Sequence, residues 1–205
     1  MNTFYLKLLA VLLMVVDHIG FFLYPQYTIL RIIGRLSFPI FGFLIANGYN
    51  YTRDKKKYFL RLFIFANIIQ IPSLFTTIPV NIFYTLSFGL LCIMIFESVY
   101  DEVNKIVGIA GILVITLMIQ PDYSIYGVLL IFIIHLLKDN YIYMIGAFLV
   151  LSFVLYGPTS IQGFAALTPL IFMTYNHQKG RSMKYLFYLF YPVHIVFLDW
   201  LSQRI

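Results

Sequence analysis

The 205-residue chain is 61% hydrophobic and only 11% charged, with a mean hydropathy of +0.90 and a formal net charge of +6. Soluble domains average about 45–50% apolar and about 25% charged residues, so a water-soluble fold of this length could not bury so much apolar surface. These totals exclude an ordinary soluble domain, a disordered chain and a nucleic-acid-binding domain. They predict an all-α, polytopic transmembrane helical bundle in a lipid bilayer.

A membrane-spanning helix needs about 20 apolar residues, with a range of about 17–25. On this basis the chain contains nine predicted spans: 4–24, 36–52, 58–75, 82–99, 105–119, 124–138, 141–156, 160–175 and 184–202. The fifth and sixth are short, so eight or ten spans also fit. The short links leave no room for a soluble domain, and residues 1–205 are expected to form a single integral-membrane domain. The first span has no A-x-A-like cleavage site, so we expect it to be a retained helix.

The distribution of Lys and Arg predicts the orientation in the membrane. Basic residues cluster in the links at 53–57 and 179–184, and Lys105 and Lys138 mark two further links. With nine spans, these links and Lys7 lie on one side, which the positive-inside rule makes cytoplasmic. The N-terminus is therefore expected in the cytoplasm, and the chain in the plasma membrane. Arg31 and Arg35 lie on the opposite side, so the positive-inside rule does not explain their presence and another explanation is needed.

Ionisable side chains inside predicted spans cost about 2.5–3.5 kcal/mol each on insertion scales, which makes them candidates for function. Asp17 and His18 lie two thirds of the way across the first span, and Lys7 lies eleven residues before His18. Eleven residues are close to three helical turns, so Lys7 and His18 share a face about 16 Å apart. A cation at the water edge and a deeper imidazole acting as general base suit a long anionic donor. A structural histidine, with Lys7 as an interfacial anchor, explains the same residues equally well.

Two further pairs share a helical face. Arg31 and Arg35 are four residues apart and could bind an anionic headgroup, a carboxylate or developing oxyanion charge. Gly34 beside them permits a close backbone approach. The alternative is an interfacial arginine pair held by lipid phosphates. Tyr191 and His194 are three residues apart. They are candidates for substrate binding, and the alternative is an aromatic packing helix with a structural histidine.

Polar residues also open the fourth and sixth predicted spans. Tyr84, Asp122 and Tyr126 are candidates for substrate binding, although helix capping alone explains Asn81 and Asp122. On the nine-span topology these residues lie at the same depth as the histidines and arginines described above. We therefore expect several ionisable and hydroxyl groups to converge in the outer half of the bundle.

Other polar residues have simpler explanations. Asn47, Asn50, Asn67 and Gln70 are expected to form hydrogen bonds between helices, and His135 is expected at the membrane interface. Cys92 is the single cysteine, so the chain can form no internal disulfide and no cysteine-based metal site. No metal-ligand spacing, P-loop, dinucleotide-binding turn or serine nucleophile motif is present, so no metal cofactor is expected.

Several strings of the sequence together resemble the TraX family. The opening of TraX-family sequences is similar to LKLLAVLLMVVDHIGFFLYP followed by LRIIGRLSFPIFGFLIANGY in this chain. The similarity continues in order through RLFIFANIIQIP, NIFYTLSFGLL, DYSIYGVLLI and YLFYPVHIVFL, and so covers nearly the whole chain. The Asp-His pair, the G-R-L-[SA]-F-P-I-F string and the Y-P-x-H ending are fairly specific in combination.

The resemblance implies an acyltransferase. TraX-type proteins are linked to N-terminal acetylation of conjugative pilin. They are similar to membrane acyltransferases that acetylate extracytoplasmic sugars and polymers and carry an Arg-x10-His motif in the first span. The matching positions here are Lys7 and His18, so the charge is kept but the bidentate guanidinium is lost. The implied donor is acetyl-CoA. The implied acceptor is an amine or hydroxyl at the outer side of the membrane, on a pilin or peptide N-terminus or a cell-envelope glycan.

Spacing and resemblance together assign expected roles. His18, Asp17 and Arg35 are the candidate catalytic residues, and Lys7 is the candidate for binding the donor phosphates. Substrate binding is assigned to Arg31, Tyr84, Asp122, Tyr126, Tyr191 and His194. The first alternative is a transporter or flippase with a proton or anion pathway, although the chain lacks the internal repeat of many transporters. The second is a scaffold subunit without site chemistry, whose polar residues would not converge.

Overall fold

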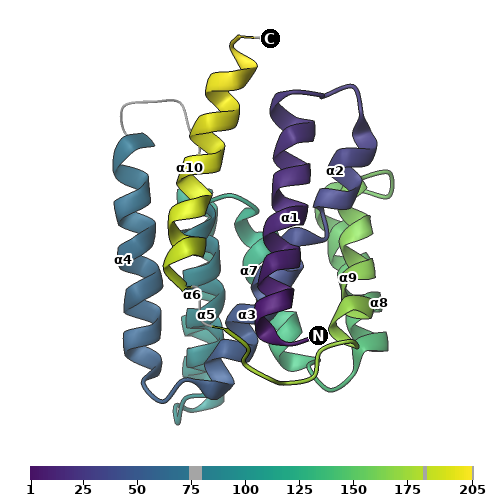
Figure 1. Cartoon of the computed structure of the whole chain (residues 1–205). Helices are drawn as coiled ribbons and strands as arrows, with labels where there is room; N and C mark the ends of the chain where they lie inside the picture. Colours follow the sequence, from purple (N-terminus) through teal and green to yellow (C-terminus); the bar gives the residue numbers. More distant parts are fainter. Residues whose placement is uncertain (74–79, 182–183, 205) are drawn as a thin grey trace. The chain divides into compact units, whose positions relative to one another are not determined.

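The computed structural model describes residues 1–73, 80–181 and 184–204, and within these ranges every regular element is a helix and no strand occurs. The all-helical fold class is thus confirmed. In chain order the elements are α1 (Thr3–Phe22), α2 (Thr28–Gly34), α3 (Ser37–Tyr51), α4 (Lys55–Ser73), α5 (Ile82–Phe96), α6 (Glu102–Ile119), α7 (Ser124–Leu136), α8 (Tyr141–Tyr156), the 3₁₀ helix η1 (Ile161–Leu167), α9 (Thr168–Phe172) and α10 (Lys184–Ser202) (Figure 1).

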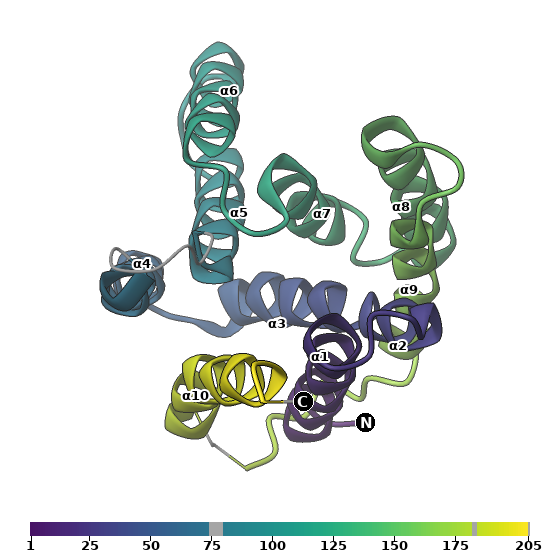
Figure 2. The same ribbon diagram turned by 90° about the horizontal axis from the view of Figure 1, so that it is seen from above.

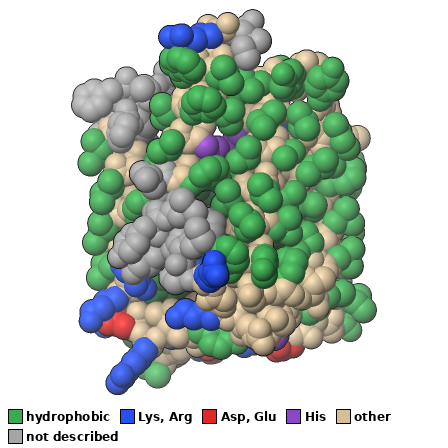
Figure 3. All heavy atoms as spheres, viewed as in Figure 1, with side chains coloured by type: hydrophobic (Ala, Val, Ile, Leu, Met, Phe, Trp, Pro, Cys, Tyr) green, Lys and Arg blue, Asp and Glu red, His purple; other side chains and the backbone are tan. Residues whose placement is uncertain are grey.

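Several of these helices are long and apolar enough for a membrane. Within the described ranges, three segments meet the length and composition needed to cross a bilayer: Thr3–Phe22, Thr28–Tyr51 (α2 and α3 taken together) and Glu102–Ile119. Four shorter apolar helices accompany them. Large hydrophobic side chains are exposed along these helices, and hydrophobic side chains cover much of the surface in Figure 3. Such extensive exposed apolar surface is suited to lipid and not to water. The chain is therefore a membrane protein, while the nine-span topology and the cytoplasmic N-terminus stay predictions.

Two segments differ from the expected spans. The predicted helix at 160–175 is instead a 3₁₀ helix followed by the five-residue α9, because Pro169 lies in the first turn of α9 and has no N–H for a continuous α-helix. The predicted link at 25–35 contains a helix of its own, α2. Arg31 lies within α2 and Arg35 caps its C-terminus, so the expected helical spacing of the two arginines is confirmed.

The chain divides into two compact units, residues 1–41 with 139–205 and residues 42–138. In the first unit, α1 packs against α2 and α10, and α8 packs against η1 and α9 (Figures 1 and 2). The contact between α1 and α2 is close because glycines lie in it. A Cβ added to Gly20 would lie 2.7 Å from the Cβ of Leu30, and one added to Gly34 would overlap the Asp17 side chain. Small residues allow helices to approach this closely in membranes.

The second unit is built around α5, which packs against α4, α6 and α7. Polar groups join α4 to the start of α5: the Asn81 side chain donates to Ala66 O at 2.9 Å and to Gln70 Oε1 at 2.8 Å. The Tyr84 hydroxyl donates to Asn67 Oδ1 at 3.0 Å. The expected hydrogen bonds of Asn67 and Gln70 between helices are confirmed, and Asn81 caps α5 through Phe83 N as its position predicts.

Candidate functional site

The buried carboxylate of Asp17 is bound by two arginines in the first unit. Arg35 Nη2 donates to Asp17 Oδ1 at 2.8 Å and to Oδ2 at 2.9 Å. Arg31 Nη1 donates to Asp17 Oδ2 and, at 2.9 Å, to the Asp17 backbone carbonyl. Asp17 is 7% exposed. A carboxylate so deeply buried is stable only when its charge is paired and its oxygens accept hydrogen bonds, and two guanidinium groups with one carboxylate leave one positive charge in excess.

Gln162 holds the other side of the Arg35 guanidinium. Its Oε1 accepts from Arg35 Nη1 at 3.2 Å, and the Arg35 Nε donates to Arg31 O at 3.4 Å. Gln162 lies in η1 and is 4% exposed. Within the described residues its Nε2 is a buried donor with no hydrogen-bond partner. Arg35 is therefore fixed by neighbours from α1, α2 and η1, and a polar donor is buried next to it.

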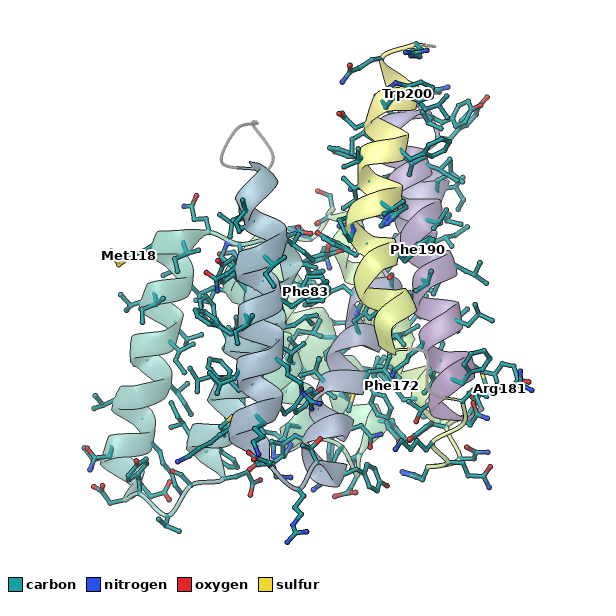
Figure 4. All side chains as sticks on the ribbon, turned by 60° about the vertical axis from the view of Figure 1, so that its left-hand side comes forward. Phe83, Met118, Phe172, Arg181, Phe190 and Trp200 are labelled. Atoms are coloured by element: carbon teal, nitrogen blue, oxygen red, sulfur yellow. The ribbon has the colours of Figure 1, made fainter. Side chains whose placement is uncertain are left out.

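His18 faces a different helix from its neighbour Asp17. Successive helical residues point about 100° apart, so Asp17 contacts α2 while His18 contacts α10. His18 Nδ1 and His194 Nε2 are 2.7 Å apart, and His194 Nδ1 lies 2.8 Å from the Phe190 carbonyl oxygen. Figure 4 labels Phe190 on α10, where this helix runs beside α1. The structure thus brings His18 and His194 together, and the Tyr191 ring packs edge-on against His194 with centroids 6.0 Å apart.

Lys7 lies near the N-terminal end of α1, where a basic link reaches it. Thr3 N donates to Gln178 O at 2.8 Å and Asn176 N donates to Met1 O at 2.8 Å. Lys179 and Arg181 follow in the same link. The expectation that Lys7 and this link share one end of the helices is confirmed. Cations gathered there could hold an anionic group about 16 Å along α1 from His18.

The second unit has a basic cavity of its own, with a volume of about 640 Å³. It is lined by Tyr49, Arg53, Asp54, Lys55, Lys56, Lys57 and Met94. The Lys55 side chain contacts Tyr49: its Nζ donates to the Tyr49 carbonyl and lies 4.2 Å from the ring centroid. This composition is the one expected of a cytoplasmic link, and it offers a second place where phosphate groups could bind.

Tyr84, Asp122 and Tyr126 all lie in the second unit. Tyr126 is 1% exposed, whereas Asp122 is exposed and its Oδ1 accepts from Tyr123 N at 3.0 Å. The Thr85 hydroxyl donates to the Asp122 carbonyl. The expected convergence of these residues with His18 and Arg35 stays a prediction, as does their part in substrate binding.

Sequence reasoning missed two features. Gln162 lay unnoticed inside a predicted span, although a lone amide among apolar residues was a usable signal. The expected place of His135 at the membrane interface stays a prediction, but its partner was missed: His135 is 4% exposed and its Nε2 lies 2.7 Å from Glu97 Oε1. The reason is that the last turn of α7 packs beside the C-terminal end of α5, where Glu97 supplies a partner. This pair lies in the second unit.

The first unit therefore contains two adjacent polar groups on α1. One is a cationic cluster that could stabilise negative charge, and the other is an imidazole pair that could accept a proton. Within the part of the chain that the structure describes, no group of three or more His, Cys, Asp or Glu side chains could hold a metal ion.

Comparison with known proteins identifies the family. A probable fimbrial assembly protein FimC, serogroup H1, of Dichelobacter nodosus is 29% identical over 238 aligned residues, covering 96% of this chain and 94% of that protein. An uncharacterized protein of Rickettsia prowazekii (strain Madrid E) is 49% identical over 80 residues, 39% of this chain and 29% of that protein. No solved structure matches the chain. The family model described as TraX protein matches residues 3–202, across both units, and the chain belongs to the TraX family.

Proposed function

We propose that the protein is an acyltransferase of the plasma membrane. It moves an acetyl group from cytoplasmic acetyl-CoA to an acceptor amine or hydroxyl at the outer side of the membrane. The observation that carries this proposal is the hydrogen-bonded His18–His194 pair beside the Asp17–Arg31–Arg35 cluster. An imidazole that can accept a proton, next to an excess positive charge that can stabilise an oxyanion, is what acyl transfer requires.

Each candidate residue then has a role. His18 accepts the proton of the acceptor amine or hydroxyl, or is itself transiently acylated. Arg35 stabilises negative charge on the tetrahedral intermediate, and Arg31 helps to bind the acceptor. Asp17 holds both guanidinium groups in place and so acts through them. Tyr84, Asp122, Tyr126 and Tyr191 remain candidates for binding the acceptor.

The donor would be bound through its phosphates. Lys7 and the basic link at 176–181 lie at one end of α1, which matches a donor with several negative charges at one end of a long arm. The thioester end of that arm would extend along α1 toward His18. Lysine contributes a point charge here, without the bidentate geometry of arginine.

The relatives support a choice of the acceptor class to test first. The named relative is a probable fimbrial assembly protein, and TraX-type proteins are linked to pilin acetylation. A pilin or peptide N-terminus is therefore the first acceptor to test, and a cell-envelope glycan is the second. Both present an amine or hydroxyl on the outer side of the membrane, where this reaction would end.

The test is transfer of labelled acetyl groups from acetyl-CoA to peptide and amino-sugar acceptors by the full chain in proteoliposomes. We expect wild-type transfer and a loss of about 10²-fold or more in His18→Gln. His135→Gln is the matched control, because a glutamine amide can keep the bond to Glu97 in the other unit. Wild-type transfer by His18→Gln would overturn the mechanism. Anion flux without acyl transfer by the wild type would instead favour the transporter.

A further inference from the structure

The protonation of His194 follows from its hydrogen bond to the backbone. Its Nδ1 lies 2.8 Å from the Phe190 carbonyl oxygen, and a carbonyl oxygen can only accept, so Nδ1 carries the hydrogen. In a neutral imidazole the other nitrogen, Nε2, then has a lone pair and no hydrogen. The Phe190 ring stacks on His194 with centroids 4.8 Å apart and an interplanar angle of 11°. The same residue therefore fixes both the orientation and the tautomer of His194.

The protonation of His18 follows in turn. Its Nδ1 is 2.7 Å from His194 Nε2. Since Nε2 of neutral His194 can only accept, Nδ1 of His18 must donate. Neutral His18 therefore has its hydrogen on Nδ1 and a lone pair on Nε2. Two hydrogen bonds in series, starting from one backbone carbonyl, thus determine which nitrogen of His18 is basic.

Both rings are assigned as neutral because of the charges that surround them. Asp17, Arg31 and Arg35 carry one positive charge in excess on the neighbouring α1 and α2. An imidazolium here would add a second positive charge inside a predicted membrane span, where a charged side chain is costly. A proton on His194 Nε2 would also reverse the donor between the two rings, so this charged state and the neutral state predict different tautomers of His18.

We propose that His194 is a positioning residue, which accepts the hydrogen bond from His18 Nδ1 and thereby presents His18 Nε2 as the basic nitrogen. Its expected part in binding the acceptor is replaced by this role. The tautomer rests on the hydrogen-bond geometry and on the neutrality of both rings, and only its use in catalysis rests on the proposed acyltransferase function. Asp17 is not needed as the partner of the imidazole, because its carboxylate is bound to two arginines.

The proton and electron balance of the step is simple. A lone pair on the acceptor nitrogen or oxygen attacks the thioester carbonyl carbon and forms the new C–N or C–O bond. The acceptor hydrogen moves to His18 Nε2 while Nδ1 still donates to His194. The C–S bond then breaks, its electrons leave on the sulfur, and the Nε2 hydrogen protonates the thiolate. His18 returns to its starting tautomer, and no other reactant is required.

The tautomer can be observed directly by ¹⁵N NMR of the full chain with labelled histidine. The chain has four histidines, so His135→Gln and His177→Gln spectra assign two of the signals and leave those of His18 and His194. We expect His18 to show a protonated Nδ1 and an unprotonated Nε2 at neutral pH. The same spectrum with the hydrogen on His18 Nε2 would overturn the proposal.

Two substitutions of His194 separate positioning from packing. In His194→Gln the amide oxygen can take the place of Nε2 and accept from His18, whereas the shorter asparagine in His194→Asn cannot reach it. We expect His194→Gln to keep the His18 tautomer and most of the turnover. His194→Asn should mix the tautomers and lower kcat by about tenfold or more, with little change in KM. Val193→Ala, an exposed neighbour on α10, is the control for disturbance of the helix.

The outcomes distinguish this proposal from the proposed function. Unchanged tautomer and turnover in His194→Asn would overturn positioning and leave the acyltransferase standing. The expected tautomers in a wild type that transfers no acetyl group would overturn the acyltransferase and leave the hydrogen-bond series standing. Circular dichroism and the thermal unfolding midpoint must match in all variants, and the wild-type NMR spectrum decides the tautomer even where a variant fails to fold.

Discussion

Gly34 of α2 lies directly against the Asp17 side chain of α1, so closely that a Cβ at position 34 would overlap the carboxylate. This contact explains how the cationic cluster is assembled. With only a hydrogen at position 34, α2 can approach α1 far enough for Arg31 and Arg35 to bind the same carboxylate. The glycine between two arginines in the sequence is thus a packing requirement of the site, as its position predicts.

Gly34→Ala should therefore disturb the site. The added methyl group must displace the Asp17 carboxylate or separate the two helices, and we expect a loss of about 1–3 kcal/mol in the free energy of unfolding, as for other overpacking changes. Gly146→Ala in α8 is the matched control, because a Cβ there meets no atom within 4 Å. That variant should be neutral or more stable by about 0.4–1 kcal/mol. Denaturant titration in micelles measures both, and equal effects would contradict this account.

Asp17→Asn should be strongly destabilising even though it keeps the shape of the side chain. It removes the carboxylate that pairs with Arg31 and Arg35 in a buried site, and breaking a buried ion pair costs about 3–5 kcal/mol. Asp199→Asn, at an exposed carboxylate on α10, is the control and should change stability by about 0.5 kcal/mol or less. A loss in Asp17→Asn no larger than in this control would show that the cluster contributes little to the fold.

Lys7 should affect donor binding more than turnover. If it contacts a phosphate of acetyl-CoA, Lys7→Ala should raise KM for acetyl-CoA by about tenfold, which corresponds to about 1.4 kcal/mol, and leave kcat nearly unchanged. Lys7→Arg should keep the affinity because it keeps the charge. Lys105→Ala, which removes a cation paired with Glu102 in the second unit, serves as the control. Steady-state kinetics that give all three variants the wild-type KM would make Lys7 a membrane anchor.

Asp54 should make stability depend on pH at the start of α4. Its carboxylate accepts from the backbone N–H of Lys57 at 2.9 Å, and this hydrogen bond lowers the pKa of Asp54 below its ordinary value of 3.8. A lowered pKa stabilises the fold above the ordinary value, and the contribution is lost as the pH falls through the lowered one. Asp54→Ala should therefore be less stable than wild type at pH 7, with the difference disappearing in strong acid. A difference that persists at every pH would assign the effect to something other than the charge.

Much of the fold could be predicted from local patterns. Apolar runs of helical length predicted nearly every helix within a few residues, since a backbone in lipid must satisfy its own hydrogen bonds. The prediction was wrong at 160–175, where Pro169 lies within an apolar run and interrupts the α-helical bonding. It also assigned α2 to a link between spans, because seven residues are too short for a span, although the helical spacing of Arg31 and Arg35 was recognised. An apolar run therefore predicts the length of a helical segment better than it predicts whether the segment is one continuous α-helix.

The candidate site could be predicted in part. The scarcity of charge singled out Asp17, His18, Arg35 and His194, and Gly34 was recognised as a point of close approach. Gln162 was overlooked because an amide carries no formal charge and so did not stand out as costly. The burial and the partner of His135 were not foreseen because that partner, Glu97, lies 38 positions away in the sequence.

The sequence by itself determined that this chain forms apolar helices, that it belongs in a membrane, and which few ionisable residues need an explanation. Those properties depend on composition and on helical periodicity, which are local. Only the tertiary structure decided the partners: Asp17 with Arg35 across 18 positions, Arg35 with Gln162 across 127, and His18 with His194 across 176. Helix packing sets these pairings, and a hydrogen bond of 2.7–3.2 Å depends on how neighbouring helices fit together. Asp17 and His18 are adjacent in the sequence, yet they contact different helices, α2 and α10.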